Sequence, residues 1–261
     1  MFRVWHTVGI KRFNQTFYSG KLITLFILLV ISLVPAATTI ASEKLVINCG
    51  NSSPYITPDG RGFYADVIEE AFRRIDIEAE LIYVVAARAL INANQGIEDG
   101  NIARLAGMEK KFPNLIRVPE KIIDFEFTAF TRDVDFKVDG WDSLKPYEIG
   151  IVTGWKIYQR NITEARLITK VKKSEQLFRL LDKDRIEVAM YERWGGAWII
   201  RELGLDLRPL APPLTVRPLY LYLHKKHAAL VPRVYQALID MKKDGSYQAI
   251  YDRNFSDLVN H

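Results

Sequence analysis

The sequence contains one cysteine, Cys49, among 261 residues. An internal disulfide is therefore excluded, and so is a metal site built on a cysteine cluster. The four histidines, His6, His224, His227 and His261, show no spacing typical of a zinc site. The sequence thus predicts neither a bound metal nor another cofactor.

Glycine patterns that bind nucleotides are also missing. No Gly-x-Gly-x-x-Gly or Walker-type sequence follows any predicted strand. The net charge of +5 does not indicate nucleic-acid binding, because Arg3, Lys11, Arg12 and Lys21 lie in an N-terminal segment that we expect to be removed. The remaining chain is close to neutral, and no nucleic-acid partner is predicted.

The N-terminal segment has the order of charged, apolar and small residues that is typical of a secretory signal peptide. Basic residues precede an uncharged apolar run at residues 22–34, and PAATTIAS follows it. We expect cleavage after Ala41, with Ala36 as the alternative, so residues 1–41 are assigned to the signal peptide. An uncleaved anchor is the competing interpretation, but this run is short for a bilayer. The predicted location is the periplasm, where a protein with a large core needs no disulfide.

Beyond the signal peptide, apolar strands alternate with amphipathic helices. Strands are predicted at residues 44–50, 79–85 and 101–105, and helices at 63–75 and 86–96. After an extended stretch at 125–138, strands at 147–154, 165–171 and 186–191 alternate with helices at 155–161, 174–184 and 192–204. A proline-rich stretch at 208–218 leads to a strand at 219–224 and to helices at 230–245 and 246–255. This order predicts the α/β class, with two similar units and a ligand cleft between them.

Several segments carry a resemblance to a known family. They are GFYADVIEEAFRRI (62–75), GIEDGNIARLAGMEKKFPN (96–114), LKPYEIGIVTGWKIYQ (144–159), DRIEVAMYERW (184–194) and the chain end from LYLYLH (219–224) to DRNF. Together they resemble the periplasmic amino-acid-binding proteins of bacterial extracellular solute-binding protein family 3.

The resemblance implies a two-lobe, type II periplasmic-binding-protein-like fold. Lobe 1 would be discontinuous, with residues 43–131 plus 218–261, and lobe 2 would comprise residues 132–217. The implied function is capture of a small polar, amino-acid-like solute by a monomer that delivers it to the permease of an ABC transporter in the inner membrane. Two alternatives are a cyclohexadienyl-dehydratase-like enzyme on the same scaffold and a sensory binder that docks to a membrane receptor. We expect a binding protein without catalytic residues, because no second catalytic group stands beside Glu192.

An amino-acid ligand needs an acid for its ammonium group and a cation for its carboxylate. The resemblance places the acid at Glu192, although a carboxylate that stabilises the start of a helix would explain this position equally well. Glu187, five residues earlier, is expected on the other side of the strand and in a structural role. For the carboxylate, the candidates are Arg104 and Lys111. The family pattern falls on Lys111, but only Arg104 has the planar fork of donors. A salt bridge at a strand edge is the alternative role for Arg104.

Three aromatic residues complete the predicted site. Tyr55 follows the first strand, where the resemblance implies a ring that covers the ligand; packing against its own loop is the alternative. Trp155 stands where the family has a small hydroxyl residue, so only the backbone N–H groups at that helix start would remain for an anion. Trp194, beside Glu192, is assigned either to the pocket or to the core.

Overall fold

The computed structural model describes Phe2 and residues 44–259. The predicted signal peptide therefore lies outside the described residues, apart from Phe2. Within the described part of the chain, no helix is long and apolar enough to cross a membrane.

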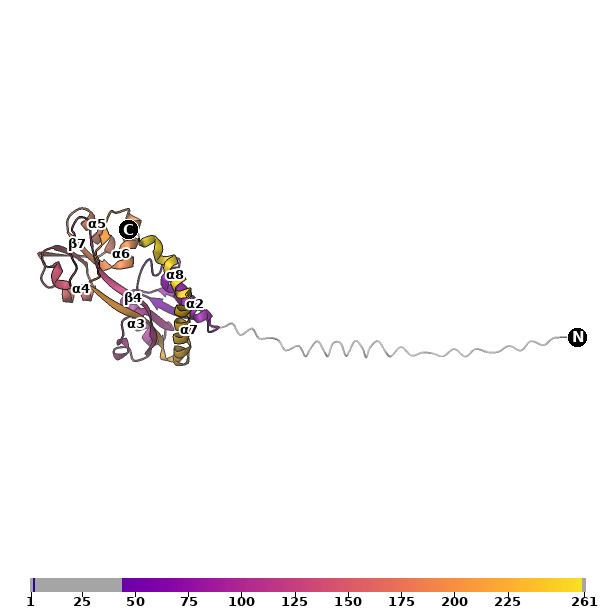
Figure 1. The fold of residues 1–261 in the computed structure, drawn as a ribbon. Coiled ribbons are helices and arrows are strands. Elements are labelled where there is room, and N and C mark those ends of the chain that lie inside the picture. The colour runs from indigo at the N-terminus through magenta and orange to yellow at the C-terminus, as the bar shows by residue number, and fades with distance from the viewer. Residues whose placement is uncertain (1, 3–43, 260–261) are drawn as a thin grey trace. The chain divides into compact units, whose positions relative to one another are not determined.

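The described residues contain helices and strands in alternation (Figure 1). The strands are β1 (Leu45–Cys49), β2 (Ala79–Tyr83), β3 (Gly100–Arg104), β4 (Leu115–Thr131), β5 (Glu148–Val152), β6 (Leu167–Val171), β7 (Val188–Glu192), β8 (Arg208–Pro209) and β9 (Thr215–His224). The α-helices are α2 (Phe63–Arg73), α3 (Ala86–Gln95), α4 (Lys156–Asn161), α5 (Ser174–Asp182), α6 (Arg193–Leu203), α7 (Val231–Lys243) and α8 (Ser246–Phe255). The short 3-10 helices are η1 (Met108–Lys110), η2 (Trp141–Leu144), η3 (Lys225–Leu230) and η4 (Ser256–Leu258). The predicted α/β class is confirmed.

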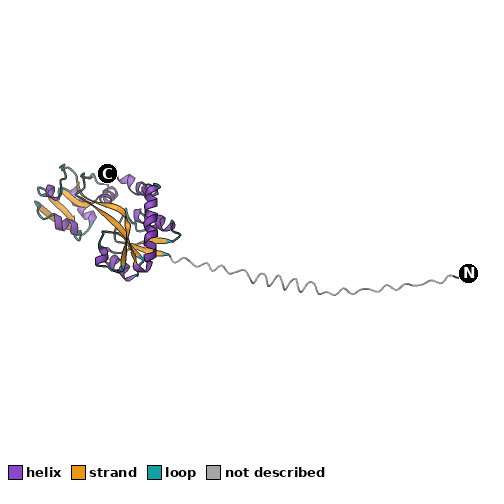
Figure 2. Ribbon diagram, turned by 60° about the horizontal axis from the view of Figure 1, so that its bottom comes forward, coloured by secondary structure: helices purple, strands orange, loops and turns teal. Residues whose placement is uncertain are grey.

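All these strands belong to one sheet with the order β2-β1-β3-β9-β4-β7-β5-β6, and β8 pairs with β4. β1 runs parallel to β2 and β3, and β5 runs parallel to β6 and β7. The long strands β9 and β4 are antiparallel to each other and join these two parallel groups (Figure 2). We refer to β1, β2, β3 and their helices as the first lobe, and to β5, β6, β7 and their helices as the second lobe.

Two strands are longer than the sequence pattern predicts. β4 begins at Leu115, before the extended stretch predicted at 125–138, and β9 begins at Thr215, within the proline-rich stretch. Pro218 is tolerated in β9 because β3 pairs only with residues 220–223 of that strand, so at Pro218 one side of β9 is an edge.

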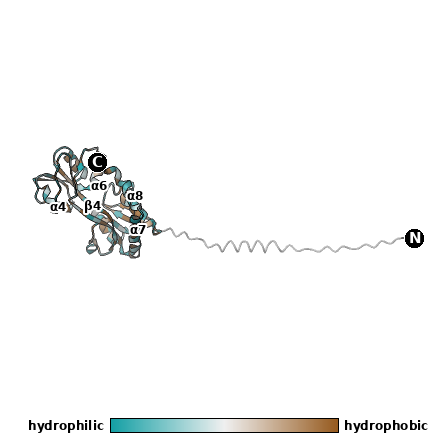
Figure 3. Ribbon diagram, in the orientation of Figure 1, coloured by the Kyte–Doolittle hydropathy of each residue, from teal (hydrophilic) through white to brown (hydrophobic). Residues whose placement is uncertain are grey.

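Helices cover both faces of the first lobe. Val67, Ile68 and Phe72 of α2 are buried in the same apolar cluster as Ile47 of β1. Asn48, the next residue of β1, points the other way and donates a hydrogen bond to Ala89 O of α3, as the alternation of a strand requires. Figure 3 shows hydrophobic and hydrophilic residues within single helices, as expected for helices with one face on a core.

The second lobe has its own apolar cluster, which includes Phe130 of β4, Phe178 of α5 and Ile200 of α6. Gly96 and Gly204 end α3 and α6 in the left-handed conformation, which glycine adopts without strain.

Candidate ligand-binding site

Four of the predicted site residues lie just beyond the carboxyl end of a strand or at its last residue. Tyr55 follows β1, Arg104 ends β3, Trp155 follows β5 and Glu192 ends β7. Ligands of parallel α/β sheets bind at these ends. The fold thus presents two predicted site residues from the first lobe and two from the second lobe.

Glu192 is the N-cap of α6 and is buried, with 3% of its surface exposed. Its Oε2 accepts a hydrogen bond from Trp194 N at 3.1 Å and another from the Tyr55 hydroxyl at 2.5 Å. Burial raises the pKa of Glu192 to about 7, and the hydrogen bonds from Tyr55, Gly195 N and Trp194 N offset part of this increase. The carboxyl group is therefore poised between its neutral and charged forms near neutral pH.

Gly195 provides the space for this carboxylate. A Cβ atom at residue 195 would lie 1.8 Å from Glu192 Oε1, so any residue other than glycine would clash with the carboxylate in its present position. Glycine at this position lets the carboxylate fold back over the first turn of α6, where backbone N–H groups and the helix dipole favour negative charge.

Tyr55 brings the first lobe into contact with Glu192. Its ring is buried and stacks on Tyr64 with centroids 4.7 Å apart, and Phe125 of β4 lies 5.7 Å away. Burial, together with the nearby Glu192 carboxylate, raises the pKa of Tyr55 well above its ordinary value, so the phenol is a hydrogen-bond donor at all relevant pH values. Tyr55 thus binds Glu192 directly.

Arg104 is half-buried at the end of β3, and its Nε donates to Asn101 Oδ1. Burial lowers the pKa of Arg104, and the nearby Cys49 and Tyr64 act in the opposite direction. Lys111, the other candidate, follows η1 and is exposed. Of the two predicted partners for a carboxylate, only Arg104 lies in a partly desolvated environment, where a charged hydrogen bond is stronger.

Trp155 lies among other aromatic rings. Its ring is 4.8 Å from that of Tyr191, stacks on Tyr158 at 5.7 Å, and stacks on Phe125 of β4 at 6.4 Å. Its backbone N–H lies 3.4 Å from Val152 O. The indole therefore forms a partly exposed aromatic surface beside β4.

Trp194 is buried in the core, with 7% of its surface exposed. It stacks on Phe255 with centroids 4.9 Å apart, and Tyr251 contacts it edge-on at 5.9 Å. Most of the Trp194 ring is thus in contact with α8, so of the two assignments left open by the sequence the geometry favours the core.

Glu187 is placed as the sequence predicts. Its Oε2 accepts a hydrogen bond from Glu148 N at 2.8 Å and pairs with Arg166 at 2.7 Å. Glu187 therefore links the starts of neighbouring strands and takes no part in the site.

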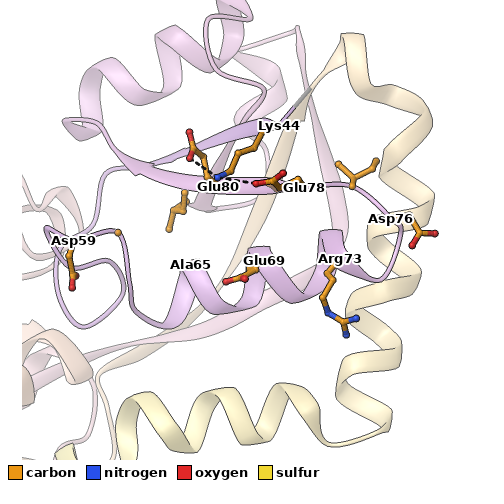
Figure 4. A pocket seen from close by; sticks show the side chains of 12 residues that line it. Lys44, Asp59, Ala65, Glu69, Arg73, Asp76, Glu78 and Glu80 are labelled. Carbon is orange, nitrogen blue, oxygen red and sulfur yellow. Dashed lines mark ion pairs between the residues drawn. The ribbon is translucent and has the colours of Figure 1, made fainter. Parts of the chain in front are cut away.

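A groove of about 610 Å³ lies elsewhere on the first lobe, between α2 and β2 (Figure 4). Lys44 on one side pairs with Glu78 at 3.3 Å and with Glu80 at 3.1 Å, while Glu69 and Arg73 project from α2 on the other. Lys44 and Glu78 precede β1 and β2, so this part of the groove is at the opposite end of the strands from Arg104.

Buried polar residues around Arg104 were not among the residues predicted from the sequence. Asn48, Glu98 and Asn101 are buried and connected by hydrogen bonds. An available signal was Asn48, a polar residue inside the apolar run LVINC. Tyr64 was missed as well; its hydroxyl is fully buried and has no hydrogen-bond partner among the described residues. Within the same part of the chain, no group of His, Cys, Asp and Glu could hold a metal ion.

Several solved structures share this fold. The chain resembles an ancestral arginine-binding protein bound to glutamine, with 15% identity, a TM-score of 0.63 and coverage of 81% of this chain and 97% of that one. It resembles the GluR0 ligand-binding core from Nostoc punctiforme in complex with L-glutamate, with 19% identity, a TM-score of 0.64 and coverage of 81% and 99%. A histidine kinase sensor domain with similarity to periplasmic binding proteins gives 17% identity, a TM-score of 0.63 and coverage of 82% and 96%. The predicted two-lobe periplasmic-binding-protein-like fold is confirmed.

Sequence comparison gives a nearer relative. The chain matches no family model. An uncharacterized protein of Shewanella oneidensis is 30% identical over 202 residues, which cover 65% of this chain and 73% of the relative. The chain therefore belongs to the same family as this Shewanella oneidensis protein.

Proposed function

We propose that this protein is an exported solute-binding protein whose two lobes close on a small amino-acid-like ligand. The observation that carries the proposal is the buried Glu192 carboxylate at the start of α6, which already contacts the other lobe through Tyr55. A buried carboxylate is costly unless it is paired. A ligand ammonium group would provide that pairing.

The ligand's two ends would then be bound from opposite lobes. Glu192 would take the ammonium group, and Arg104 would take the carboxylate in a charge-assisted hydrogen bond. The Tyr55 hydroxyl would either turn from Glu192 toward the ligand or keep its bond to the Glu192 carboxylate while the ligand ammonium group binds the same carboxylate. The partly exposed ring of Trp155, which stacks on the buried Phe125, offers surface for an apolar or cationic side chain. Lys111 and Trp194 would lie at the margin of the site.

The lobe limits belong to this proposal. Lobe 1 would comprise residues 43–131 and 218–261, and lobe 2 residues 132–217. Because β4 and β9 connect the two parallel groups of strands, closure would bend these two strands near the lobe limits. Residues 1–41 would direct the chain to the periplasm and be removed.

Delivery to an ABC transporter is the first candidate for the downstream step. The similar structures include the substrate-binding protein of an amino acid ABC transporter, with 16% identity and a TM-score of 0.61. Docking to a membrane receptor is the second candidate, and the similarity to a histidine kinase sensor domain favours it. Deleting the gene and measuring ligand uptake separates them, because only the transporter partnership predicts that uptake is lost.

A thermal-shift screen tests the binding function. The protein, purified after export, is melted with L-amino acids, amines, organic acids and small peptides at millimolar concentration. A ligand that binds only the folded state raises the melting temperature. We expect the largest shift with an L-amino acid, and the absence of any shift across the whole screen would rule out the proposed function.

A further inference from the structure

A chain of buried polar side chains leads through the first lobe to Arg104. Glu98 lies in the turn before β3, Asn48 in β1 and Asn101 in β3. Asn48 and Asn101 are completely buried and Glu98 is 7% exposed. The proposed binding function uses none of these three residues.

The hydrogen bonds that connect these side chains all run from donor to acceptor in one direction, from Arg104 to Glu98. Arg104 Nε donates to Asn101 Oδ1, Asn101 Nδ2 donates to Asn48 Oδ1, and Asn48 Nδ2 donates to Glu98 Oε2 at 2.7 Å. Each amide accepts on the side of the arginine and donates on the side of the glutamate. If either amide were flipped, two donors or two acceptors would face each other. The guanidinium at one end and the carboxylate at the other therefore fix the orientation of both amides.

A bulge in β3 allows Arg104 to reach Asn101 and so to join this series of hydrogen bonds. In a regular strand, Asn101 and Arg104 would point to opposite faces, because they are three residues apart. The pairing of β3 with β9 shifts register between these two residues, and Ala103 adopts φ 64°. A bulge redirects the side chain that follows it. It thus brings Arg104 to the same face as Asn101.

We propose that Glu98, Asn48 and Asn101 are positioning residues that fix the guanidinium plane of Arg104 for a ligand carboxylate. This inference rests on the proposed binding function and deepens it, because it specifies a ligand that carries a carboxylate. Asn101 holds Nε, so the guanidinium cannot rotate freely about its long side chain. The Glu98 carboxylate accepts the last hydrogen bond of the series and polarises the two amides toward Arg104.

Asn92 provides a matched control. Its Nδ2 donates to Glu98 Oε1 at 3.1 Å, so it contacts the same carboxylate without lying on the path to Arg104. The variants are Asn101→Ala, Glu98→Gln and Asn92→Ala. Glu98→Gln removes the charge and keeps the size of the side chain. Its one carbonyl oxygen can still accept from Asn48, while its amide nitrogen then faces Asn92.

The first measurement needs no ligand. In the exported protein, hydrogen exchange at Arg104 Nε–H is followed by NMR, with assignment through Arg104→Lys. We expect slow exchange in the wild type and in Asn92→Ala, and faster exchange in Asn101→Ala and Glu98→Gln. Unchanged exchange in Asn101→Ala would overturn the positioning role.

The second measurement uses the L-α-amino acids and their α-carboxamides as probes in calorimetric titrations. We expect Asn101→Ala to reduce the preference for carboxylate over carboxamide by about fivefold to tenfold. The Arg104→Lys variant has no Nε–H to donate to Asn101. Adding Asn101→Ala to it should therefore cause no further loss of the preference for carboxylate over carboxamide. Additive losses would show that Asn101 acts only on the fold and would overturn the inference. If the wild type binds none of the probes, the proposed function and the carboxylate role fail. The exchange experiment still decides whether Asn101, Asn48 and Glu98 position Arg104.

Discussion

The Tyr55 hydroxyl donates a 2.5 Å hydrogen bond to Glu192 Oε2, joining two residues that are 137 positions apart. Tyr55 follows β1 of the first lobe and Glu192 ends β7 of the second. Each side chain is buried, so the bond has little competition from water. The two lobes are thereby linked at the residue that we propose binds the ligand.

Tyr55 and Tyr64 offer a direct comparison, because their rings stack on each other and only the Tyr55 hydroxyl has a hydrogen-bond partner among the described residues. We expect Tyr55→Phe to lower the free energy of unfolding by about 1–3 kcal/mol, since it removes a donor from a buried carboxylate. Tyr64→Phe should be neutral or slightly stabilising, because the lost hydroxyl satisfies nothing among the described residues. Urea unfolding of both variants measures the difference, and equal losses would contradict the role given to the Tyr55 bond.

The pKa of Glu192, about 7 compared with 4.5 in the unfolded chain, predicts how stability depends on pH. The folded protein retains a proton that the unfolded chain releases, so this contribution is complete below pH 4.5 and is lost as pH rises through about 7. Glu192→Gln stays neutral throughout. Its stability relative to the wild type should increase between pH 5 and 8, by on the order of 3 kcal/mol.

Thermal melts at several pH values measure this difference. Burial lowers the pKa of His224, so its contribution to stability changes with pH in the opposite direction, but His224 is present in both proteins. The difference between variant and wild type therefore isolates Glu192. A constant difference from pH 5 to 8 would show that Glu192 is already ionised throughout this range.

Ligand affinity should also depend on pH. An ammonium group requires charged Glu192, so below pH 7 binding must first remove a proton from the carboxyl group. We expect the affinity for an amino acid from the screen to rise by up to about tenfold per pH unit below the Glu192 pKa and to level off above it. Titration calorimetry in two buffers of different ionisation enthalpy would detect the released proton, and no release at pH 6 would argue against Glu192 as the partner.

Arg104 and Lys111 differ in burial, which separates the two candidates for the carboxylate. Arg104→Ala should weaken binding about tenfold or more, because charged hydrogen bonds contribute about 1.5–3 kcal/mol each. Lys111→Ala should stay within about twofold of the wild type, as exposed charges contribute little. The reverse order in calorimetric titrations would assign the carboxylate to Lys111.

Two neighbouring glycines of α6 make another matched pair. A Cβ at residue 195 would meet the Glu192 carboxylate at 1.8 Å, whereas a Cβ at residue 196 would meet the ring of Phe130 at 2.2 Å. Gly195→Ala should displace the carboxylate and reduce affinity by about tenfold. Gly196→Ala should mainly destabilise the fold, by about 1–3 kcal/mol, because the core cannot easily make room. Affinity and unfolding free energy measured on both variants test this division.

The sequence predicts what depends on neighbours along the chain. The apolar face of α2 and the glycines after α3 and α6 follow from local periodicity and backbone preference. Glu192 could be placed at the end of a strand and the start of a helix for the same reason. Its burial could not be predicted, because Tyr55 belongs to the other lobe. The contact between Asn101 and Arg104 was equally inaccessible, since the bulge at Ala103 arises in the pairing of β3 with β9.

Strand β4 has a consequence for how the molecule unfolds. Its residues Phe125 and Phe127 are buried in one apolar cluster together with Ile47 of the first lobe and Ile149 of the second, and Phe130 belongs to the cluster of α5. Neither lobe can lose its core without exposing residues of a strand that the other still needs. Heating or denaturant should therefore melt both lobes in a single cooperative transition, and a ligand bound between them would protect the whole chain.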